Sequence, residues 1–168
     1  MTADMAADTV SPHYRSGTPL IAVHDAPAAL DFYQAAFGAQ PLARLDAPDG
    51  RVMHAAILIY GSPVVVADEM PEVGLHSPHH YGGTAFSIIL ACEDADAAHA
   101  RAVAAGALSL APVQEDFSGS RHGLVQCPFG HRWLTTSRTE ALSFDQINDR
   151  FQAWLAAGEP IELSQDGG

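Results

Sequence analysis

Short apolar runs of the length of β-strands, separated by glycine, proline and aspartate, dominate the first half of the chain. Such runs, bounded by turn residues, predict strands at residues 20–23, 41–45, 52–60 and 64–67. Leu30, Tyr33 and Phe37 recur instead at helical spacing. Pro27 stands at a first helical position and Gly38 follows the last apolar residue, so a helix is predicted between them. The predicted order is β-α-β-β-β.

The same order returns in the second half. Strands are predicted at residues 85–92, 108–111, 123–127 and 132–136, and an alanine-rich helix at residues 95–105. The turn aspartates Asp25 and Asp94 lie 69 residues apart, and so do the hairpin glycines Gly61 and Gly130. A constant offset at two distant landmarks indicates an internal duplication. The predicted fold is therefore α+β, with two β-α-β-β-β modules in tandem.

This repeat divides the chain into a flexible arm (residues 1–16), a first module (17–67), a loop (68–83), a second module (84–137) and a C-terminal helix with its tail (138–168). The helix is predicted over residues 143–157, because Ser143 and Gln146 have capping-box spacing. Its apolar stripe contains Phe144, Ile147 and Phe151, and either the core or a partner subunit could cover it.

The composition limits the kinds of partner that this chain is expected to bind. The net charge of −12 argues against binding to duplex nucleic acid, which needs a basic face, and favours a neutral or cationic ligand. No targeting segment or bilayer-spanning run is evident, so we expect no membrane contact and a soluble, cytoplasmic location. Cys92 and Cys127 are too few for a disulfide framework and are predicted to be free thiols.

Three sequence strings carry a family resemblance: PLIAVHDAPAALDFYQAAFGA, PDGRVMHAAI and PFGHRW. With the tandem modules they resemble the vicinal oxygen chelate superfamily, which contains glyoxalase I, bleomycin-resistance proteins and extradiol dioxygenases. The resemblance covers residues 17–137. It implies a cup-shaped, curved mixed sheet formed by paired modules, commonly across a homodimer.

The resemblance also implies where a metal would be held. Metal-dependent members supply two ligands from each module, and these positions fall at Thr18, Val65, Ser87 and Leu134 in this chain. None of the four side chains is a nitrogen, sulfur or carboxylate ligand, of which a catalytic divalent ion normally needs about three. We therefore expect no metal and no cofactor in the cup.

Four residues are candidates for ligand binding. His54 lies within a predicted strand and is either a structural histidine or a ligand-contacting or acid–base group. Trp133 follows a tight turn and either packs in the core or lines the cavity. Phe117 and Arg121 flank a Ser-Gly-Ser turn, where a binding role and a solvated turn are equally compatible with the sequence.

Other residues have simpler interpretations. His76, His79 and His80 resemble a metal-binding tract, but a proline-containing loop between modules is more simply solvated. Cys127 stands where relatives usually have Asp, and it is interpreted as a small buried residue rather than a nucleophile.

These observations favour a small-molecule binding protein that sequesters a drug-like or metabolite ligand without a metal. The alternative is a glyoxalase-like lyase or isomerase, or a dioxygenase-related enzyme, with an atypical metal site or metal-independent acid–base chemistry. A duplicated scaffold without a ligand is the third hypothesis.

Overall fold

The computed structural model describes residues 14–15 and 17–158, and the first module has the predicted order of elements. They are β1 (Leu20–Val23), α1 (Ala26–Phe37), β2 (Gln40–Asp46), β3 (Val52–Ile59) and β4 (Ser62–Asp68). The Asp25 carboxylate accepts the Ala28 N–H at 3.0 Å and begins α1, and Gly38 ends the helix in the left-handed conformation. Both ends of the helix therefore follow the sequence signals.

The second module repeats the order after a structured connection. Its elements are β5 (Ser87–Ala91), α3 (Ala95–Ala104), β6 (Leu108–Glu115), β7 (Ser120–Gln126) and β8 (Arg132–Arg138). Asp94 caps α3 by accepting the Ala97 N–H at 2.9 Å, as its counterpart Asp25 does in α1. The duplication therefore extends to the hydrogen bonds that begin each helix.

The connection between modules is not the plain loop that the sequence predicted. It contains η1 (Pro71–Val73) and α2 (Pro78–Tyr81), each with a proline in its first turn and a left-handed glycine after its last residue. Strand β6 is also longer than expected and continues through Pro112. A proline is tolerated there because β6 lies at the edge of its sheet and its pairing with β7 is irregular at that point.

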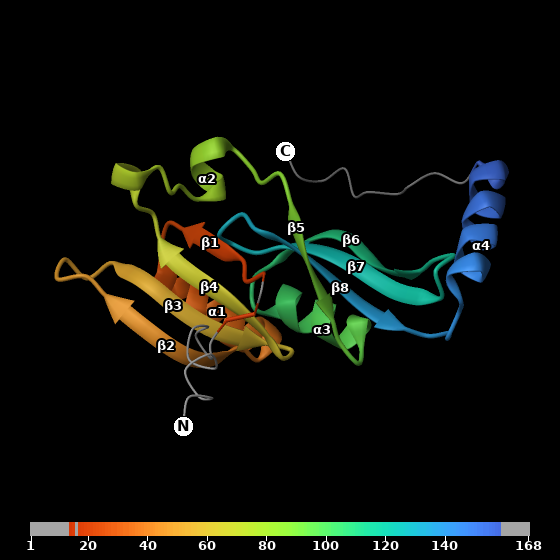
Figure 1. Ribbon diagram of the computed structural model, residues 1–168, viewed down its shortest axis with the longest axis horizontal. Helices are drawn as coiled ribbons and strands as arrows, with labels where there is room; N and C mark the ends of the chain where they lie inside the picture. Colours follow the sequence, from red (N-terminus) through yellow and green to blue (C-terminus); the bar gives the residue numbers. More distant parts are fainter. Residues whose placement is uncertain (1–13, 16, 159–168) are drawn as a thin grey trace, which may run out of the picture.

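The strands form two separate four-stranded mixed sheets with the same arrangement, β1-β4-β3-β2 and β5-β8-β7-β6. In each sheet the first strand is parallel to the fourth, and the other pairs are antiparallel. Figure 1 shows the two modules side by side along the long axis. Helices α1 and α3 lie near the middle of the molecule, where the modules meet. The predicted α+β fold with tandem modules is confirmed.

One hydrophobic core joins the modules. Tyr33 and Phe37 of α1 pack on the ring of Trp133 in β8, with centroid distances of 5.1 and 5.2 Å. Helix α1 also packs against α3, and buried residues of both sheets belong to the same cluster. Gly123 permits the close approach of α3, because a Cβ there would lie 2.7 Å from Nδ1 of His99. The modules are thus fixed to each other by apolar packing.

Helix α4 (Phe144–Ala157) lies apart from this core at one end of the molecule (Figure 1). The predicted capping box between Ser143 and Gln146 is present, yet none of its residues is buried. Within residues 14–15 and 17–158, no helix is both long and apolar enough to cross a membrane. The flexible arm predicted at residues 1–16 lies outside the described residues except for residues 14–15, and the predicted tail beyond residue 158 lies outside them as well.

Candidate functional site

Each sheet has one face packed on the shared core and a second face that we call its open face. Side chains alternate between the two faces along a strand, so the register of the ladders assigns them. In the first sheet, the cross-strand row Leu20, Val65, Ala56 and Ala43 lies on the open face, and none of these residues belongs to the core cluster. His54 lies on the same face, opposite Leu45.

The open face of the second sheet has an equivalent apolar row. Ile89 pairs with Leu134, Leu134 with Leu124, and Leu124 with Ala111. Polar residues flank this row on both sides: Ser87, Arg132 and Gln126 form one neighbouring row, and Thr136, His122 and Gln114 form the other. An apolar centre with a few polar groups at its border is the usual composition of a small-molecule site.

Large apolar side chains are exposed on both open faces. Leu20 and Leu45 are 50% and 65% exposed on the first, and Ile89 and Leu108 are 66% and 48% exposed on the second. These four residues lie on edge strands, whereas Val65, Ala56 and Leu124 in the middle of the rows are 3%, 1% and 7% exposed. Exposed apolar side chains at the borders of a sheet face favour the binding of a ligand or another protein there. The open faces are therefore the candidate functional surfaces.

Few polar groups on these faces have partners. On the first, His54 Nε2 lies 3.2 Å from the hydroxyl of Tyr14, which places this part of the N-terminal segment over the sheet. On the second, His122 Nε2 lies 3.7 Å from a carboxylate oxygen of Asp116. Arg132 Nε is shielded from solvent and has no hydrogen-bond partner among the described residues, so it is a donor that a ligand could satisfy.

The positions implied for a metal do not form a donor set. Val65 and Leu134 lie in the middle of the two apolar rows, Ser87 begins β5, and Thr18 precedes β1. Among residues 14–15 and 17–158, no three His, Cys, Asp or Glu side chains are close enough together to hold a metal ion. The side chains at these positions therefore do not fit a catalytic divalent ion.

The four residues proposed from the sequence lie in different places. His54 is on the first open face. Trp133 is fully buried in the shared core, so of its two interpretations the structure shows core packing. Its position follows from alternation: Trp133 and Thr135 point to the core, whereas Arg132 and Leu134 point away from it.

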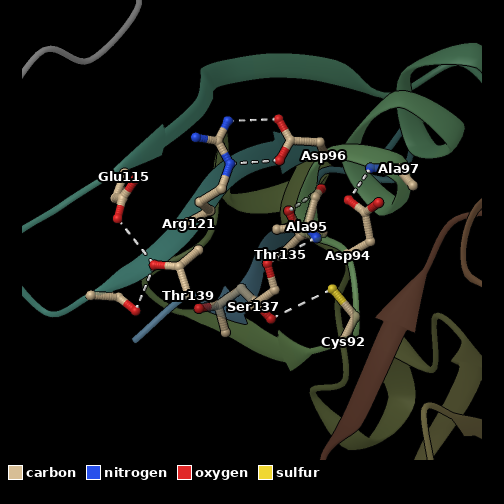
Figure 2. Close-up of polar contacts among 12 residues, drawn as sticks. Cys92, Asp94, Ala95, Asp96, Ala97, Glu115, Arg121, Thr135, Ser137 and Thr139 are labelled. Carbon is tan, nitrogen blue, oxygen red and sulfur yellow. Dashed lines mark hydrogen bonds and ion pairs between the residues drawn. The ribbon is translucent and has the colours of Figure 1, made fainter. Parts of the chain in front are cut away.

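Arg121 and Phe117 serve contacts within the chain. The Arg121 guanidinium makes a two-bond ion pair with Asp96 at the start of α3, at 2.7 and 2.8 Å, and this pair lowers the pKa of the Asp96 carboxyl (Figure 2). Phe117 packs on the aromatic rings of Phe151 and Trp154 in α4. The structure therefore does not bring the four residues into one site.

The histidine loop and Cys127 also make internal contacts. His76 stacks on His80 with a centroid distance of 3.9 Å, and the His79 ring lies 4.5 Å from that of His24, tilted by 33°. The Cys127 sulfur is buried, 3.7 Å from the hydroxyl of Tyr33, and burial beside this thiol raises the pKa of the tyrosine. Its location agrees with a small buried residue.

Sequence reasoning missed Ile89, Leu124, Arg132 and His122 as members of an open face. The signal was present: in GHRWLTT, the buried Trp133 fixes the side on which Arg132 and Leu134 lie. The pairing of β5 with β8, which brings Ile89 beside Leu134, connects distant segments and could not be read from local pattern.

Comparison with known proteins agrees with this geometry. Residues 12–135 match the family described as Glyoxalase/Bleomycin resistance protein/Dioxygenase superfamily. The protein Rv0887c of Mycobacterium tuberculosis is 37% identical over 133 residues, which cover 77% of this chain and 78% of that protein. A protein of Arabidopsis thaliana, At5g48480, is 30% identical over 122 residues, covering 68% of this chain and 73% of that protein.

Solved structures share the fold. TioX from Micromonospora sp. ML1 is 29% identical, with a TM-score of 0.59 over 75% of this chain and 100% of that chain. The fosfomycin resistance protein FosX from Listeria monocytogenes, solved with Mn(II) and a dihydroxypropylphosphonic acid, is 17% identical, with a TM-score of 0.57 over 82% of this chain and 98% of that chain. The latter likeness concerns the fold alone. The chain belongs to the glyoxalase, bleomycin resistance protein and dioxygenase superfamily.

Proposed function

We propose that this protein binds and sequesters a small drug-like or metabolite molecule without a metal, and that the open face of the second sheet is its main contact surface. The observation that carries the proposal is the row Ile89, Leu134 and Leu124, bordered by Arg132 and His122. This row places apolar surface where a metal-dependent relative would have ligands. Burial of a ligand's apolar part there would contribute most of the binding free energy.

Polar groups at the border would orient the ligand. The shielded Nε of Arg132 favours a ligand with a carbonyl or another acceptor above this residue. The net charge of −12 attracts cationic molecules at longer range, so a cation that carries an acceptor group suits both features. The description of the family as including bleomycin resistance supports a drug-like ligand class.

A homodimer is part of the proposal. The open faces expose Leu20, Leu45, Ile89 and Leu108, and a monomer would leave them in water. An open face of a second copy placed over the second sheet would enclose the ligand between two apolar walls. This arrangement would also cover the exposed apolar side chains of the open faces.

One observation favours the metal-free enzyme as a second candidate. His54 and the Tyr14 hydroxyl form a hydrogen-bonded pair on the first open face. A histidine beside a phenol can exchange a proton with a bound molecule at neutral pH. In a dimer this pair would face the ligand from the opposite wall.

A thermal-shift screen with peptide and glycopeptide antibiotics and small aromatic metabolites tests the proposal. A ligand at 100 times its Kd should add about 2.7 kcal/mol to the free energy of unfolding. For a hit, Arg132→Gln and Leu134→Asp should weaken binding, whereas Arg44→Gln, a control at an exposed ion pair in β2, should not. Mass spectrometry of the recovered ligand decides between candidates: an unchanged molecule supports sequestration, and an altered one supports the enzyme. Binding that is insensitive to both open-face variants would contradict the proposed surface.

A further inference from the structure

A cleft of about 740 Å³ lies where the β3–β4 hairpin of the first module meets α3 and the ends of β5 and β8. Its wall includes Tyr60, Cys92, Arg101, Ser137 and Arg138. Thr136, from the polar border of the second open face, also lines it, but no residue of the apolar rows does. Figure 2 shows Cys92 and Ser137 side by side there, with the Ser137 hydroxyl accepting the Ala95 N–H at 3.2 Å. The volume is in the range of small-molecule sites.

The first module has a cleft of about 540 Å³ at the equivalent place, lined in part by His24, Asp25, Asp68 and Glu69. Four residues of the cleft in the second module are Cys92, Arg101, Ser137 and Arg138. Their counterparts 69 positions earlier are Val23, Phe32, Asp68 and Glu69. Val23 and Phe32 are buried in the core. Asp68 uses one carboxylate oxygen for the Ala26 N–H and the other for the Val52 N–H, both at 2.7 Å.

The second module replaces each of these residues. Cys92 stands for Val23, the exposed Arg101 for Phe32, Ser137 for Asp68 and Arg138 for Glu69. Ser137 still holds the first N–H of its helix, but its single oxygen makes no bond to β7. At these four positions the exchange removes two acidic groups and adds two arginines, so the cleft of the second module carries basic groups that the acidic cleft of the first lacks at these positions.

Neither of these arginines forms an ion pair with a carboxylate of the described residues. All eight basic side chains of the chain are arginines, and the described part of the chain pairs Arg44, Arg51, Arg121 and Arg150 with carboxylates. Arg101 instead donates to the Tyr60 hydroxyl at 2.6 Å, and Arg138 makes only a long bond of 3.5 Å to the Leu142 carbonyl. Arg15 and Arg132 also have no carboxylate partner in the described part of the chain, so a missing ion pair is not distinctive by itself. Arg101 and Arg138 differ in that both line one cleft, where a single anion would contact both guanidinium groups.

Two acidic residues, Glu93 and Asp94, also line the cleft, so its formal charges balance. Asp94 accepts the Ala97 N–H as the cap of α3. Within the described residues neither carboxylate forms an ion pair with Arg101 or Arg138, so both guanidinium groups keep donors for a ligand.

Tyr60 is placed at the cleft by an uncommon backbone conformation. It has φ +45°, followed by Gly61 at +79°, in the two-residue turn between β3 and β4. Asparagine, aspartate or glycine normally occupies such a turn position, because a large side chain there is strained. From this turn, the Tyr60 hydroxyl accepts a hydrogen bond from Arg101 of α3. The hydroxyl proton of Tyr60 stays available for an acceptor.

We propose that this cleft is a binding site for a small molecule that carries a carboxylate. The carboxylate bonds to Arg101 and Arg138, with the Tyr60 and Ser137 hydroxyls as further donors. The apolar part of the molecule lies on the alanines of α3, Ala97 and Ala98, which also line the cleft. This site is separate from the ligand surface proposed above, so either can fail without the other.

Cys92 provides a built-in reporter for the test. It lies in the cleft wall and is partly exposed, whereas the other cysteine, Cys127, is 2% exposed. Burial raises the pKa of the Cys92 thiol, so iodoacetamide should alkylate it slowly enough for rates to be followed by mass spectrometry. Benzoate, used as the probe, should slow this alkylation in a saturable way. Benzamide has the same shape without the charge and should protect at least about tenfold less well.

Variants locate the binding groups. Arg101→Gln and Arg138→Gln should each raise the benzoate concentration needed for half-protection by about five- to tenfold. The control Arg150→Gln removes an arginine of α4 that is paired with Glu140, and it should leave protection unchanged. Circular dichroism checks that each variant is folded. Equal protection by benzoate and benzamide, no protection by either, or full protection in the Arg101→Gln/Arg138→Gln double variant would overturn the proposal.

Discussion

Tyr33 of α1 and Trp133 of β8 lie with ring centroids 5.1 Å apart, and both side chains are completely buried. This contact joins a helix of the first module to a strand of the second. The hairpins of the two modules also make matching contacts. Phe129 packs on Phe32, and Tyr60 accepts a hydrogen bond from Arg101. Tyr60 and Phe129 lie 69 residues apart, and so do Phe32 and Arg101. The duplicated modules therefore fold onto each other through equivalent positions.

Trp133 is expected to contribute to stability and not directly to ligand binding. Trp133→Ala should lower the free energy of unfolding by about 3–5 kcal/mol, because it leaves a cavity under Tyr33 and Phe37. Denaturant titration measures this loss, and Val73→Ala at a 73% exposed position in η1 should change stability by less than about 0.5 kcal/mol. A variant that keeps full stability but loses ligand affinity would show instead that Trp133 lines the ligand site.

The Arg121–Asp96 pair should make part of the stability dependent on pH. The hydrogen bonds from Arg121 lower the pKa of Asp96 in the folded state. Its contribution is therefore complete above the unfolded-state pKa of about 3.9 and is lost as the pH falls through the lower folded-state pKa. Wild type should be slightly more stable than Arg121→Gln at pH 6, and the two should converge near pH 2.

High salt provides the control for that measurement. The two side chains are 35% and 52% exposed, so 1 M NaCl should reduce the difference between wild type and Arg121→Gln. Ligand affinity should be the same in both proteins. A loss of affinity without a change in acid stability would assign Arg121 to a binding site.

Local sequence signals predicted the fold well, because the start and end of each helix depend on only a few neighbouring residues. Asp25 and Asp94 marked the starts of α1 and α3 in the sequence, and Gly38 marked the end of α1. The candidate site was harder, because face assignment depends on pairing between distant strands. Arg121 lies on a strand that begins before the predicted residue 123, and its partner Asp96 is 25 residues away. Nothing local to Arg121 distinguishes an ion pair with a helix from a ligand contact.

Removal of metal should leave the protein unchanged. Val65 and Leu134 offer no donor atoms at the implied ligand positions. Dialysis against EDTA should therefore leave the thermal unfolding midpoint and the affinity for any ligand unchanged, and metal analysis of gently purified protein should find no stoichiometric ion. A bound ion that disappears together with affinity in His54→Ala would contradict this expectation.

The open faces should support a dimer at micromolar concentration. Ile89→Asp places a charge at a position that is 66% exposed in the single chain, so the variant should fold and fail to associate. Sedimentation should then give 17.7 kDa for this variant and twice that mass for wild type. Val73→Asp, at a 73% exposed position in η1, is the matched control and should remain dimeric. A monomeric wild type would contradict the proposed enclosure of the ligand.

Helix α4 should unfold locally when its aromatic contact is removed. It lies beyond the residues that match the family and has no buried side chain, and Phe117 packs on Phe151 and Trp154 at 5.0 and 5.6 Å. An aromatic pair contributes about 0.5–1.5 kcal/mol, so Phe117→Ala should speed hydrogen exchange of the α4 amides several-fold. Exchange in β7 and β8 should not change, because the shared core does not include α4. Phe144→Ala, at an 81% exposed position, is the control and should leave exchange in α4 nearly as it is. If Phe117→Ala instead lowers the stability of the whole chain, α4 belongs to the cooperative fold, and its exposed stripe is held by more than this aromatic cluster.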